Sequence, residues 1–268
     1  MHLKTLLAGL SLRSATADME TEITRISYDS RTTAPGDVFV AMTGFATDGH
    51  AYIGKAVAAG AAAVVCERPP EDSSVPYVLV ENSRRALAVM AANYYGHPAD
   101  SMTMVAVTGT NGKTTTTYLL KAILEQELGA KVGLIGTNQD LIGDEVVPTE
   151  RTTPESLELQ ELFARMRSAG CTHVVMEASS HALALDRVYG IHYAVGIFTN
   201  LTQDHLDFHK TMEAYCDAKA ILFQNCDVGV CNADDPWTER LLQNAACRQY
   251  FYAEHAHQSW HSRRVYGI

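Results

Sequence analysis

The sequence has no hydrophobic run long enough to cross a bilayer near its start. The apolar residues between Met1 and Leu10 give way to Ser11 and Arg13, well short of the ~20 residues that a spanning helix requires. The same segment lacks the basic start, apolar stretch and small-residue cleavage site of a secretory signal. These absences predict a cytoplasmic protein without membrane insertion.

Paired cysteine motifs are also missing. The six cysteines are scattered without CxxC spacing, which argues against a disulfide framework and against a cysteine-based metal site. We therefore expect free thiols in a reducing compartment. The cysteines are Cys66, Cys171, Cys216, Cys226, Cys231 and Cys247.

Positive charge is scarce. The 268 residues include 21 Lys and Arg against 31 Asp and Glu, a formal net charge of −10. No clustered basic surface is evident, so nucleic acid is not an expected partner, and any anionic ligand must be held by a local site.

With 47% hydrophobic and 19% charged residues, the chain can build a substantial core. This composition excludes disordered and collagen-like classes, and the length suggests one large domain or two smaller ones.

Short apolar runs alternate with helical patterns along most of the chain, and Gly96-His97-Pro98 marks a boundary between a domain at 1–98 and a domain at 99–268. This alternation predicts an α/β fold, in which a small α/β domain precedes a doubly wound, mostly parallel sheet. From Tyr250 the pattern becomes irregular, and His255, His257 and His261 are interpreted as part of that irregular end. The expected strands are 23–27, 37–42, 62–66, 77–80, 102–107, 131–135, 173–176 and 193–198, and the expected helices are 51–59, 82–95, 113–128 and 155–169.

A glycine-rich segment lies between the expected strand 102–107 and the expected helix 113–128. It reads Thr108-Gly-Thr-Asn-Gly-Lys-Thr114, which is typical of a phosphate-binding loop although the spacing between its glycines is shorter than in the general pattern. The glycines would let backbone N–H groups face an anion, Lys113 would reach terminal phosphates, and the Thr114 hydroxyl would ligate Mg²⁺.

Three further polar side chains are candidates on weaker grounds. Glu177 follows a strand and is either a Mg²⁺ ligand or an ordinary strand-end charge. His205 lies in an Asp- and His-rich loop after another strand, and is either a metal ligand or a satisfied polar residue. By pattern alone, Lys219 is a solvated lysine on a helix.

Taken together and in order, five segments resemble those of the Mur ligases. They are Thr108–Thr114, Thr152-Thr-Pro154, Glu177-Ala-Ser-Ser-His181, Asn200-Leu-Thr-Gln-Asp-His-Leu-Asp207 and Ala218-Lys219. The N-terminal Tyr28-Asp-Ser-Arg31, Gly36–Ala41 and Gly44–Gly49 segments narrow the resemblance to the members that add the third residue of the peptidoglycan stem peptide. Arg151 and Leu185-Asp186 depart from the family pattern.

The resemblance implies an ATP- and Mg²⁺-dependent amide synthesis through an acyl phosphate. The implied partners are UDP-N-acetylmuramoyl-L-alanyl-D-glutamate, ATP, and either diaminopimelate or lysine. It also implies that Lys219 is carbamoylated by CO₂, which reverses the interpretation from pattern alone. The implied catalytic residues are Lys113, Lys219 and His205, and the implied metal ligands are Thr114, Glu177, His205 and the Lys219 carbamate. The implied ATP site consists of Gly109, Thr110, Asn111, Gly112, Lys113, Thr114 and Thr115. The implied substrate contacts are Ser30, Phe45, Ala46, Thr47, Thr152, Thr153, Ser179 and Arg187.

Family members carry a further C-terminal domain with the amino-acid pocket, and this sequence is expected to lack it. Two alternatives follow. The chain could be a binding module for ATP or a UDP-sugar without ligase activity, or another ligase of the superfamily such as a folylpolyglutamate synthetase. The Asp29-Ser30-Arg31 segment disfavours the latter.

Overall fold

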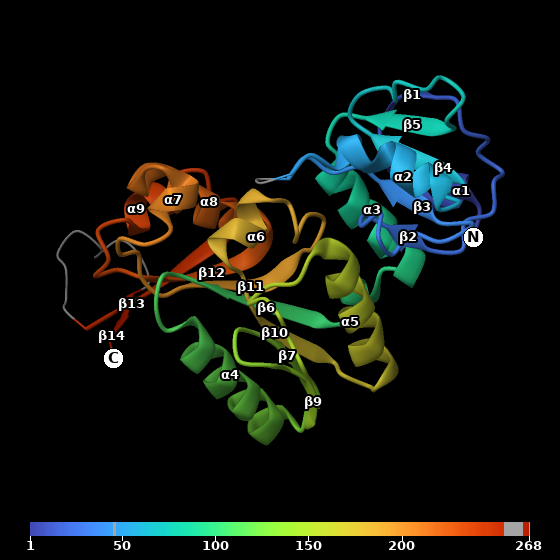
Figure 1. Ribbon diagram of the computed structural model, residues 1–268. Helices are drawn as coiled ribbons and strands as arrows, with labels where there is room; N and C mark the ends of the chain where they lie inside the picture. Colours follow the sequence, from blue (N-terminus) through green and yellow to red (C-terminus); the bar gives the residue numbers. More distant parts are fainter. Residues whose placement is uncertain (45–46, 255–264, 268) are drawn as a thin grey trace. The chain divides into compact units, whose positions relative to one another are not determined.

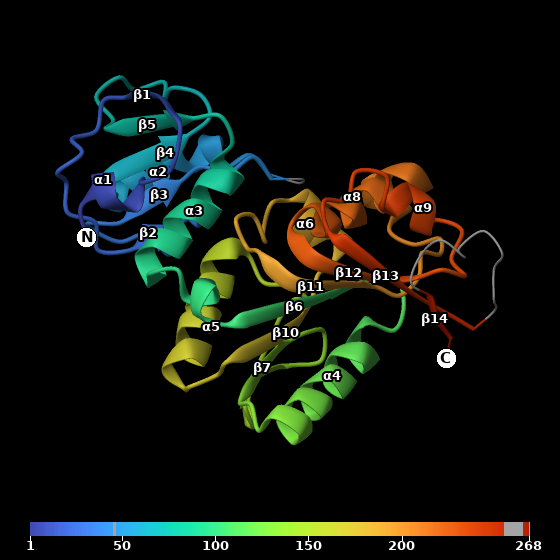
Figure 2. The same cartoon turned by 180° about the vertical axis from the view of Figure 1, so that it is seen from behind.

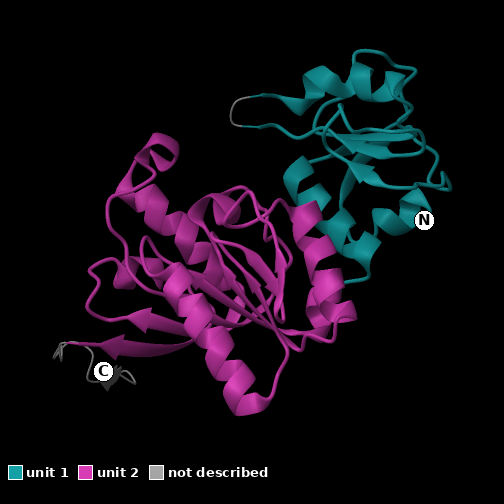
Figure 3. Ribbon diagram, turned by 60° about the horizontal axis from the view of Figure 1, so that its bottom comes forward, with its two compact units in different colours: residues 1–97 teal, residues 98–268 magenta. Residues whose placement is uncertain are grey.

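The computed structural model describes residues 1–44, 47–254 and 265–267. Two binding candidates, Phe45 and Ala46, and the three tail histidines, His255, His257 and His261, therefore lie outside the described residues. The chain forms two compact units, residues 1–97 and residues 98–268 (Figure 3). Each unit is described by itself below.

The first unit is built on a five-stranded sheet in the order β1-β5-β4-β3-β2, parallel except for β1, which runs antiparallel to β5. Its longest helix, α3, begins after Asn82, whose side chain accepts a hydrogen bond from the Arg85 N–H, and ends at Gly96 in the left-handed conformation. The strands are Leu12–Ala15, Ile26–Ser27, Val38–Val40, Ala63–Cys66 and Tyr77–Val80 (β1–β5), and the helices are α1 Leu3–Leu6, η1 Gly49–Tyr52, α2 Ile53–Ala58 and α3 Ser83–Tyr95.

The second unit contains a nine-stranded sheet in the order β14-β13-β12-β11-β6-β10-β7-β8-β9. The strands from β14 to β7 are parallel, and only β8 and β9 run antiparallel to their neighbours. The strands are Thr103–Thr108, Val132–Ile135, Asp140–Ile142, Glu145–Val147, His173–Glu177, Tyr193–Phe198, Cys226–Asn232, Arg248–Ala253 and Val265–Gly267 (β6–β14). The helices are η2 Pro98–Ser101, α4 Lys113–Leu128, α5 Ser156–Ser168, α6 Ser180–Ala184, α7 Leu206–His209, α8 Met212–Gln224 and α9 Thr238–Leu241.

Helices cover both faces of this sheet (Figures 1 and 2). Val105 and Val175 face α4 and pack with its residues Leu120 and Leu124. Their strand neighbours point the other way, into a larger core shared with α5, α6 and α8. Among the described residues, none of the helices combines the length and apolar character that a membrane crossing requires.

The predicted fold class is confirmed, because the central sheet is mostly parallel with helices on both faces. Three features of the second unit were not predicted. The antiparallel pair β8 and β9 turns at Gly143, with φ +62°, and is too short to give a pattern. Strand β12 was also missed, and the prediction of irregularity from Tyr250 is wrong, because β13 extends to Ala253 beside β12.

Asp140 provides a test of this core, because it is a buried carboxyl at the start of β8. Burial raises its pKa to about 6, although it accepts a hydrogen bond from the Gly136 N–H at 3.2 Å. In the unfolded chain the pKa is about 3.9. The folded state therefore binds more protons between these two values, and the stability contribution of Asp140 is lost as the pH rises from about 4 to about 6.

Asp140→Asn keeps an oxygen acceptor and removes the charge. We expect the free energy of unfolding at pH 7 to rise by about 1–3 kcal/mol, and the difference between variant and parent to shrink towards pH 4. Urea unfolding across this range measures both effects. Asp144→Asn, at an exposed position, is the matched control, and equal effects of the two substitutions would contradict the assignment.

Candidate active site

The carboxyl ends of β6, β7, β10 and β11 meet at one edge of the parallel sheet, the usual location of ligand sites in such folds. The loop from Gly109 to Gly112 connects β6 to α4, and Lys113 is the first residue of that helix. Both glycines have positive φ angles, +149° and +85°. The loop therefore adopts a backbone that other residues would adopt only with strain.

The end of β11 fixes the shape of this loop. The Thr110 N–H donates to the Asn200 carbonyl at 2.8 Å, and the Asn111 N–H donates to the Asn200 side-chain oxygen at 3.0 Å. The Thr199 hydroxyl donates to the Asn111 carbonyl at 2.7 Å. A segment about 90 residues away in the sequence thus holds the loop.

Gly109 is the position where a side chain is least tolerable. A Cβ there would stand 1.9 Å from the Thr199 hydroxyl oxygen. We expect Gly109→Ala to displace the loop and weaken ATP binding at least tenfold, with a lower melting temperature, as isothermal titration and thermal unfolding would show. Gly129→Ala, which also has positive φ but no atom within 4 Å of the new Cβ, is the control for backbone strain, and equal loss in both variants would contradict this reasoning.

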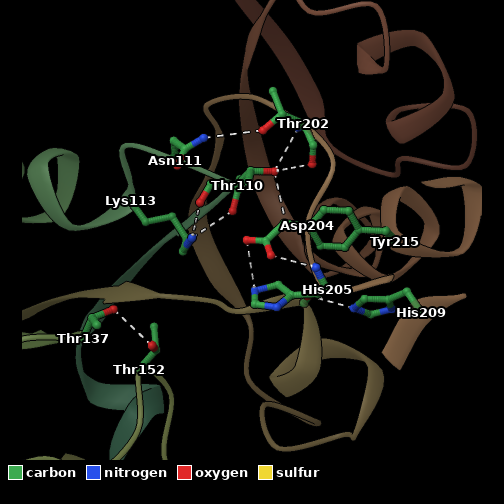
Figure 4. A network of polar contacts seen from close by, with 12 residues as sticks. Thr110, Asn111, Lys113, Thr137, Thr152, Thr202, Asp204, His205, His209 and Tyr215 are labelled. Atoms are coloured by element: carbon green, nitrogen blue, oxygen red, sulfur yellow. Dashed lines mark hydrogen bonds and ion pairs between the residues drawn. The ribbon is translucent and has the colours of Figure 1, made fainter. Parts of the chain in front are cut away.

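Two lysines converge on the Gly109 carbonyl. Lys113 Nζ donates to the carbonyls of Gly109 and Thr110, both at 2.9 Å, and Lys219 Nζ donates to the Gly109 carbonyl at 2.8 Å (Figure 4 shows Lys113). The interpretation of Lys219 as a solvated lysine is wrong. Its side chain is 1% exposed on the inner face of α8, because the helix packs against the sheet.

Burial lowers the pKa of Lys219 well below the usual value of a lysine, and the positive charge of Lys113 lowers it further. Burial also lowers the pKa of Lys113, while Glu177 and Asp204 oppose that effect. Both burial and the neighbouring Lys113 thus make the ammonium form of Lys219 less favourable than that of an exposed lysine.

Glu177 ends β10 as a fully buried carboxylate. One oxygen accepts hydrogen bonds from the Thr114 hydroxyl at 2.8 Å and the Thr137 N–H at 3.0 Å, and the other accepts from the Thr137 hydroxyl at 3.1 Å. Gly136 makes the approach possible, since a Cβ there would stand 2.6 Å from the carboxylate. Glu177 is thus held beside the first turn of α4.

A Mg²⁺ ion fits the side chains at this point. Within the part of the chain that the structure describes, no three His, Cys, Asp or Glu side chains form a metal-binding group. However, Mg²⁺ usually takes only one or two protein oxygens and completes its shell with water and substrate phosphates. The Thr114 hydroxyl and the Glu177 carboxylate supply such oxygens at the start of α4.

His205 contacts Asp204, with the ring Nε2 3.5 Å from the carboxylate (Figure 4). It has a left-handed backbone, with φ +52°, and is about half exposed. Its ring lies against those of His181 and Tyr215, with centroids 4.9 and 6.0 Å away. Burial lowers the pKa of the neighbouring His209 to about 4, so His209 is neutral at pH 7.

The remaining candidates of the second unit form a second group beside Glu177. The Thr152 and Thr137 hydroxyls lie 3.0 Å apart (Figure 4), and the Thr153 hydroxyl donates to the Glu177 carbonyl at 2.8 Å. The Thr153 and Ser179 hydroxyl oxygens lie 3.2 Å apart, and the Thr153 carbonyl accepts a hydrogen bond from the Arg187 guanidinium at 3.1 Å. These contacts place the Thr152, Thr153, Ser179 and Arg187 candidates at the same sheet edge as Glu177. Thr115 is exposed on the first turn of α4.

In the first unit, Ser30 and Thr47 follow β2 and β3 at the carboxyl edge of the smaller sheet. Ser30 is 8% exposed, and the Thr47 carbonyl accepts a hydrogen bond from the Gly44 N–H at 2.9 Å. Sequence reasoning missed the ion pair of Asp48 with Arg68 and the contact of the Asp48 carboxylate with the His50 ring, 2.7 Å away, at this edge. Asp48 entered the sequence analysis only as part of the Gly44–Gly49 segment.

In the second unit, sequence reasoning did not single out Thr137, Asn200 and Asp204. All three follow strands or lie in a loop at the carboxyl edge, so applying the strand-end rule to every strand would have found them. Tyr215 was also missed. Its ring lies 4.5 Å beneath Lys219 Nζ and its hydroxyl is 3.2 Å from that of Thr110, a contact that no local pattern reveals.

Residues 107–267 match the Mur ligase middle domain, and residues 22–95 match the domain described as Mur ligase family, catalytic domain. The chain belongs to the Mur ligase family. It is similar to the UDP-N-acetylmuramoyl-L-alanyl-D-glutamate--2,6-diaminopimelate ligases of Clostridium tetani (48% identical over 257 residues) and Clostridium botulinum (47% over 278). These alignments cover 94% and 99% of this Mur ligase chain but 53% and 57% of those proteins, so the chain spans about half their length.

Solved structures show the same fold. A structure of a UDP-N-acetylmuramoyl-L-alanyl-D-glutamate--2,6-diaminopimelate ligase superposes with a TM-score of 0.78 at 25% identity, covering 96% of this Mur ligase chain and 53% of that chain. The D-alanyl-D-alanyl-adding ligase of Acinetobacter baumannii gives a TM-score of 0.55 at 22% identity, covering 86% and 48%. The latter likeness concerns the fold alone.

Proposed function

We propose that this chain provides the substrate-activating part of a cytoplasmic, ATP-dependent ligase of peptidoglycan synthesis. The reaction joins diaminopimelate to UDP-N-acetylmuramoyl-L-alanyl-D-glutamate. One observation carries the proposal: Lys113, Lys219, Thr114 and Glu177 all gather around one glycine-rich loop. The choice of reaction is supported by the names of relatives that are nearly half identical to the chain.

The chemistry explains why such a loop is needed. A carboxylate is a poor electrophile at neutral pH, because an oxide anion is a poor leaving group. Attack of the substrate carboxylate on the γ-phosphorus of ATP would break the bond to ADP and give an acyl phosphate. The amine of the incoming amino acid would then form the amide bond and release phosphate. Positioning and charge neutralisation dominate catalysis of this kind.

The residues of the loop would act on the phosphates. The segment from Gly109 to Thr115 would bind the phosphates. The N–H groups of Thr110 and Asn111 donate to Asn200, so those from Gly112 to Thr115 would face the phosphate oxygens at the start of α4. Lys113 would exchange its two carbonyl contacts for the β- and γ-phosphate oxygens. Mg²⁺ held by Thr114 and Glu177 would neutralise phosphate charge when bound, and His205 is a further ligand implied by the family resemblance.

Lys219 is proposed to react with CO₂. The neutral amine attacks the carbon of CO₂ and loses one proton to water, leaving a carbamate with one negative charge. The lowered pKa of Lys219 favours the reactive neutral amine. The anionic carbamate would attract the Lys113 ammonium, whereas an unmodified Lys219 ammonium would repel it. A buried lysine next to a second lysine thus becomes an oxygen donor suited to Mg²⁺.

The other candidates are proposed to bind the UDP-sugar peptide. Ser30 and Thr47, with Phe45 and Ala46 beyond the described residues, would hold the uridine nucleotide in the first unit. In the second unit, Thr152, Thr153, Ser179 and Arg187 would hold the peptide. Arg187 also pairs with Glu155 at 3.3 Å, which orients its guanidinium.

Calorimetric titration of the 268-residue chain tests the proposal. We expect binding of UDP-N-acetylmuramoyl-L-alanyl-D-glutamate and, separately, of ATP with Mg²⁺. Phosphate release with diaminopimelate, compared with lysine, then tests the reaction. Binding without phosphate release would support the alternative of a binding module without ligase activity, and binding of neither ligand would overturn the assignment.

A further inference from the structure

Two of the six cysteines lie side by side at the amino-terminal ends of β12 and β13, the opposite edge of the sheet from the proposed ATP site. Cys226 is the first residue of β12, and Cys247 directly precedes β13. The two strands are parallel neighbours. Sequence reasoning treated both as ordinary free thiols, because they are 21 positions apart and show no motif.

Two glycines make room for the sulfur atoms. Gly196 on β11 and Gly229 on β12 are register partners. A Cβ on Gly196 would stand 3.1 Å from the Cys226 sulfur, and a Cβ on Gly229 would stand 2.8 Å from the Cys247 sulfur. Because adjacent strands are about 4.8 Å apart, this pair of glycines brings the two sulfur atoms into one space.

Other atoms around this space are those of the C-terminal turn of α8. Leu222 lies beside the Gly196 position, and Phe223 lies beside the Gly229 position. Cys226 is buried, whereas Cys247 is only partly buried. Cys247 is thus the more accessible of the two cysteines.

The two thiols also interact directly. Interaction between the two thiols lowers the pKa of Cys247 and raises that of Cys226, and backbone N–H groups including that of Gly229 lower the pKa of Cys247 further. A thiolate is the nucleophile in exchange with disulfides. Cys247 is also the more exposed of the two cysteines, so Cys247 is the attacking thiol and Cys226 the second one.

We propose that Cys226 and Cys247 form a dithiol site that reacts with small-molecule disulfides such as glutathione disulfide. The Cys247 thiolate attacks one sulfur of the reagent, whose S–S bond breaks and releases one thiolate. The Cys226 thiol then loses its proton to solvent and attacks the Cys247 sulfur, expelling the second thiolate. The two cysteines are oxidised to one disulfide, and the reagent is reduced to two thiols.

The inference is independent of the proposed function, because its test needs no nucleotide. The folded 268-residue chain is incubated with glutathione disulfide, its remaining thiols are blocked by an alkylating agent, and its peptides are identified by mass spectrometry. We expect a linked Cys226–Cys247 peptide pair. Cys247 should be consumed at least about tenfold faster than Cys66 or Cys171, which are buried.

Single variants separate the two roles. Cys226→Ser should stop at a stable glutathione adduct on Cys247, and Cys247→Ser should leave Cys226 reduced. Cys66→Ser, which removes a buried thiol in the other unit, is the matched control and should still give the linked pair. Continued protection of Cys171 shows that the folded protein is the reacting species. No linked pair, or oxidation of Cys226 without Cys247, would overturn the proposal.

Discussion

Lys113→Ala is expected to reduce ATP-dependent phosphate release by at least about 10²–10³-fold, the effect typical of losing one preorganised charge contact to the reacting group. Lys113 is the first residue of α4, and its Nζ reaches across the loop to the Gly109 and Thr110 carbonyls. Lys219 is a poor substitute, because its side chain is buried and its pKa is lowered by that burial. Titration with ATP and Mg²⁺ should show a parallel loss of affinity.

A matched control exists in Lys131. It also donates its Nζ to a backbone carbonyl, that of Ala169 at 2.9 Å, but its side chain is exposed. Lys131→Ala should therefore leave ATP affinity and phosphate release unchanged. The affinity for UDP-N-acetylmuramoyl-L-alanyl-D-glutamate should stay the same in both variants. Phosphate release by Lys113→Ala at the rate of the parent chain would contradict the proposed role of the glycine-rich loop in binding the ATP phosphates.

Local patterns in the sequence predicted the central elements of the fold well. Strand β6 and helix α4 have the predicted bounds to within one residue, because continuous apolar runs and 3–4 spacing dominate there. Strands β12 and β13 were missed. Each mixes polar residues with apolar ones, such as Asp227 in β12 and Arg248 in β13, so neither gives the continuous apolar run that predicted β6.

The limits of prediction are clearer at the site. Glu177 could be found because it ends a strand, but its burial depends on Thr114 and Thr137, which come from two other elements. Lys219 shows the same limit more strongly. One helix pattern fits both a solvated lysine and a lysine aimed at Gly109, 110 positions away, and only the packing of α8 on the sheet decides between them.

Lys219→Ala is expected to weaken phosphate release at saturating ATP by at least about tenfold, because the proposed carbamate supplies a negative oxygen donor near the phosphates. The chain without that lysine retains a cavity at the inner face of α8, since the side chain is 1% exposed. A small carboxylic acid such as acetate or propionate carries the same charge and donor atoms as a carbamate. Added at high concentration, it should restore part of the activity.

Rescue distinguishes the proposed chemistry from a merely structural role of Lys219. The same acid should not restore Lys113→Ala, because that variant lacks a cation, and an added anion would increase the repulsion of the phosphates. Chloride at equal ionic strength should restore neither variant. Full activity of Lys219→Ala without acid, or equal rescue of both lysine variants, would contradict the carbamate. Selective rescue of Lys219→Ala would show that the site requires a carboxylate-like group at the position where the Lys219 amine now contacts the Gly109 carbonyl.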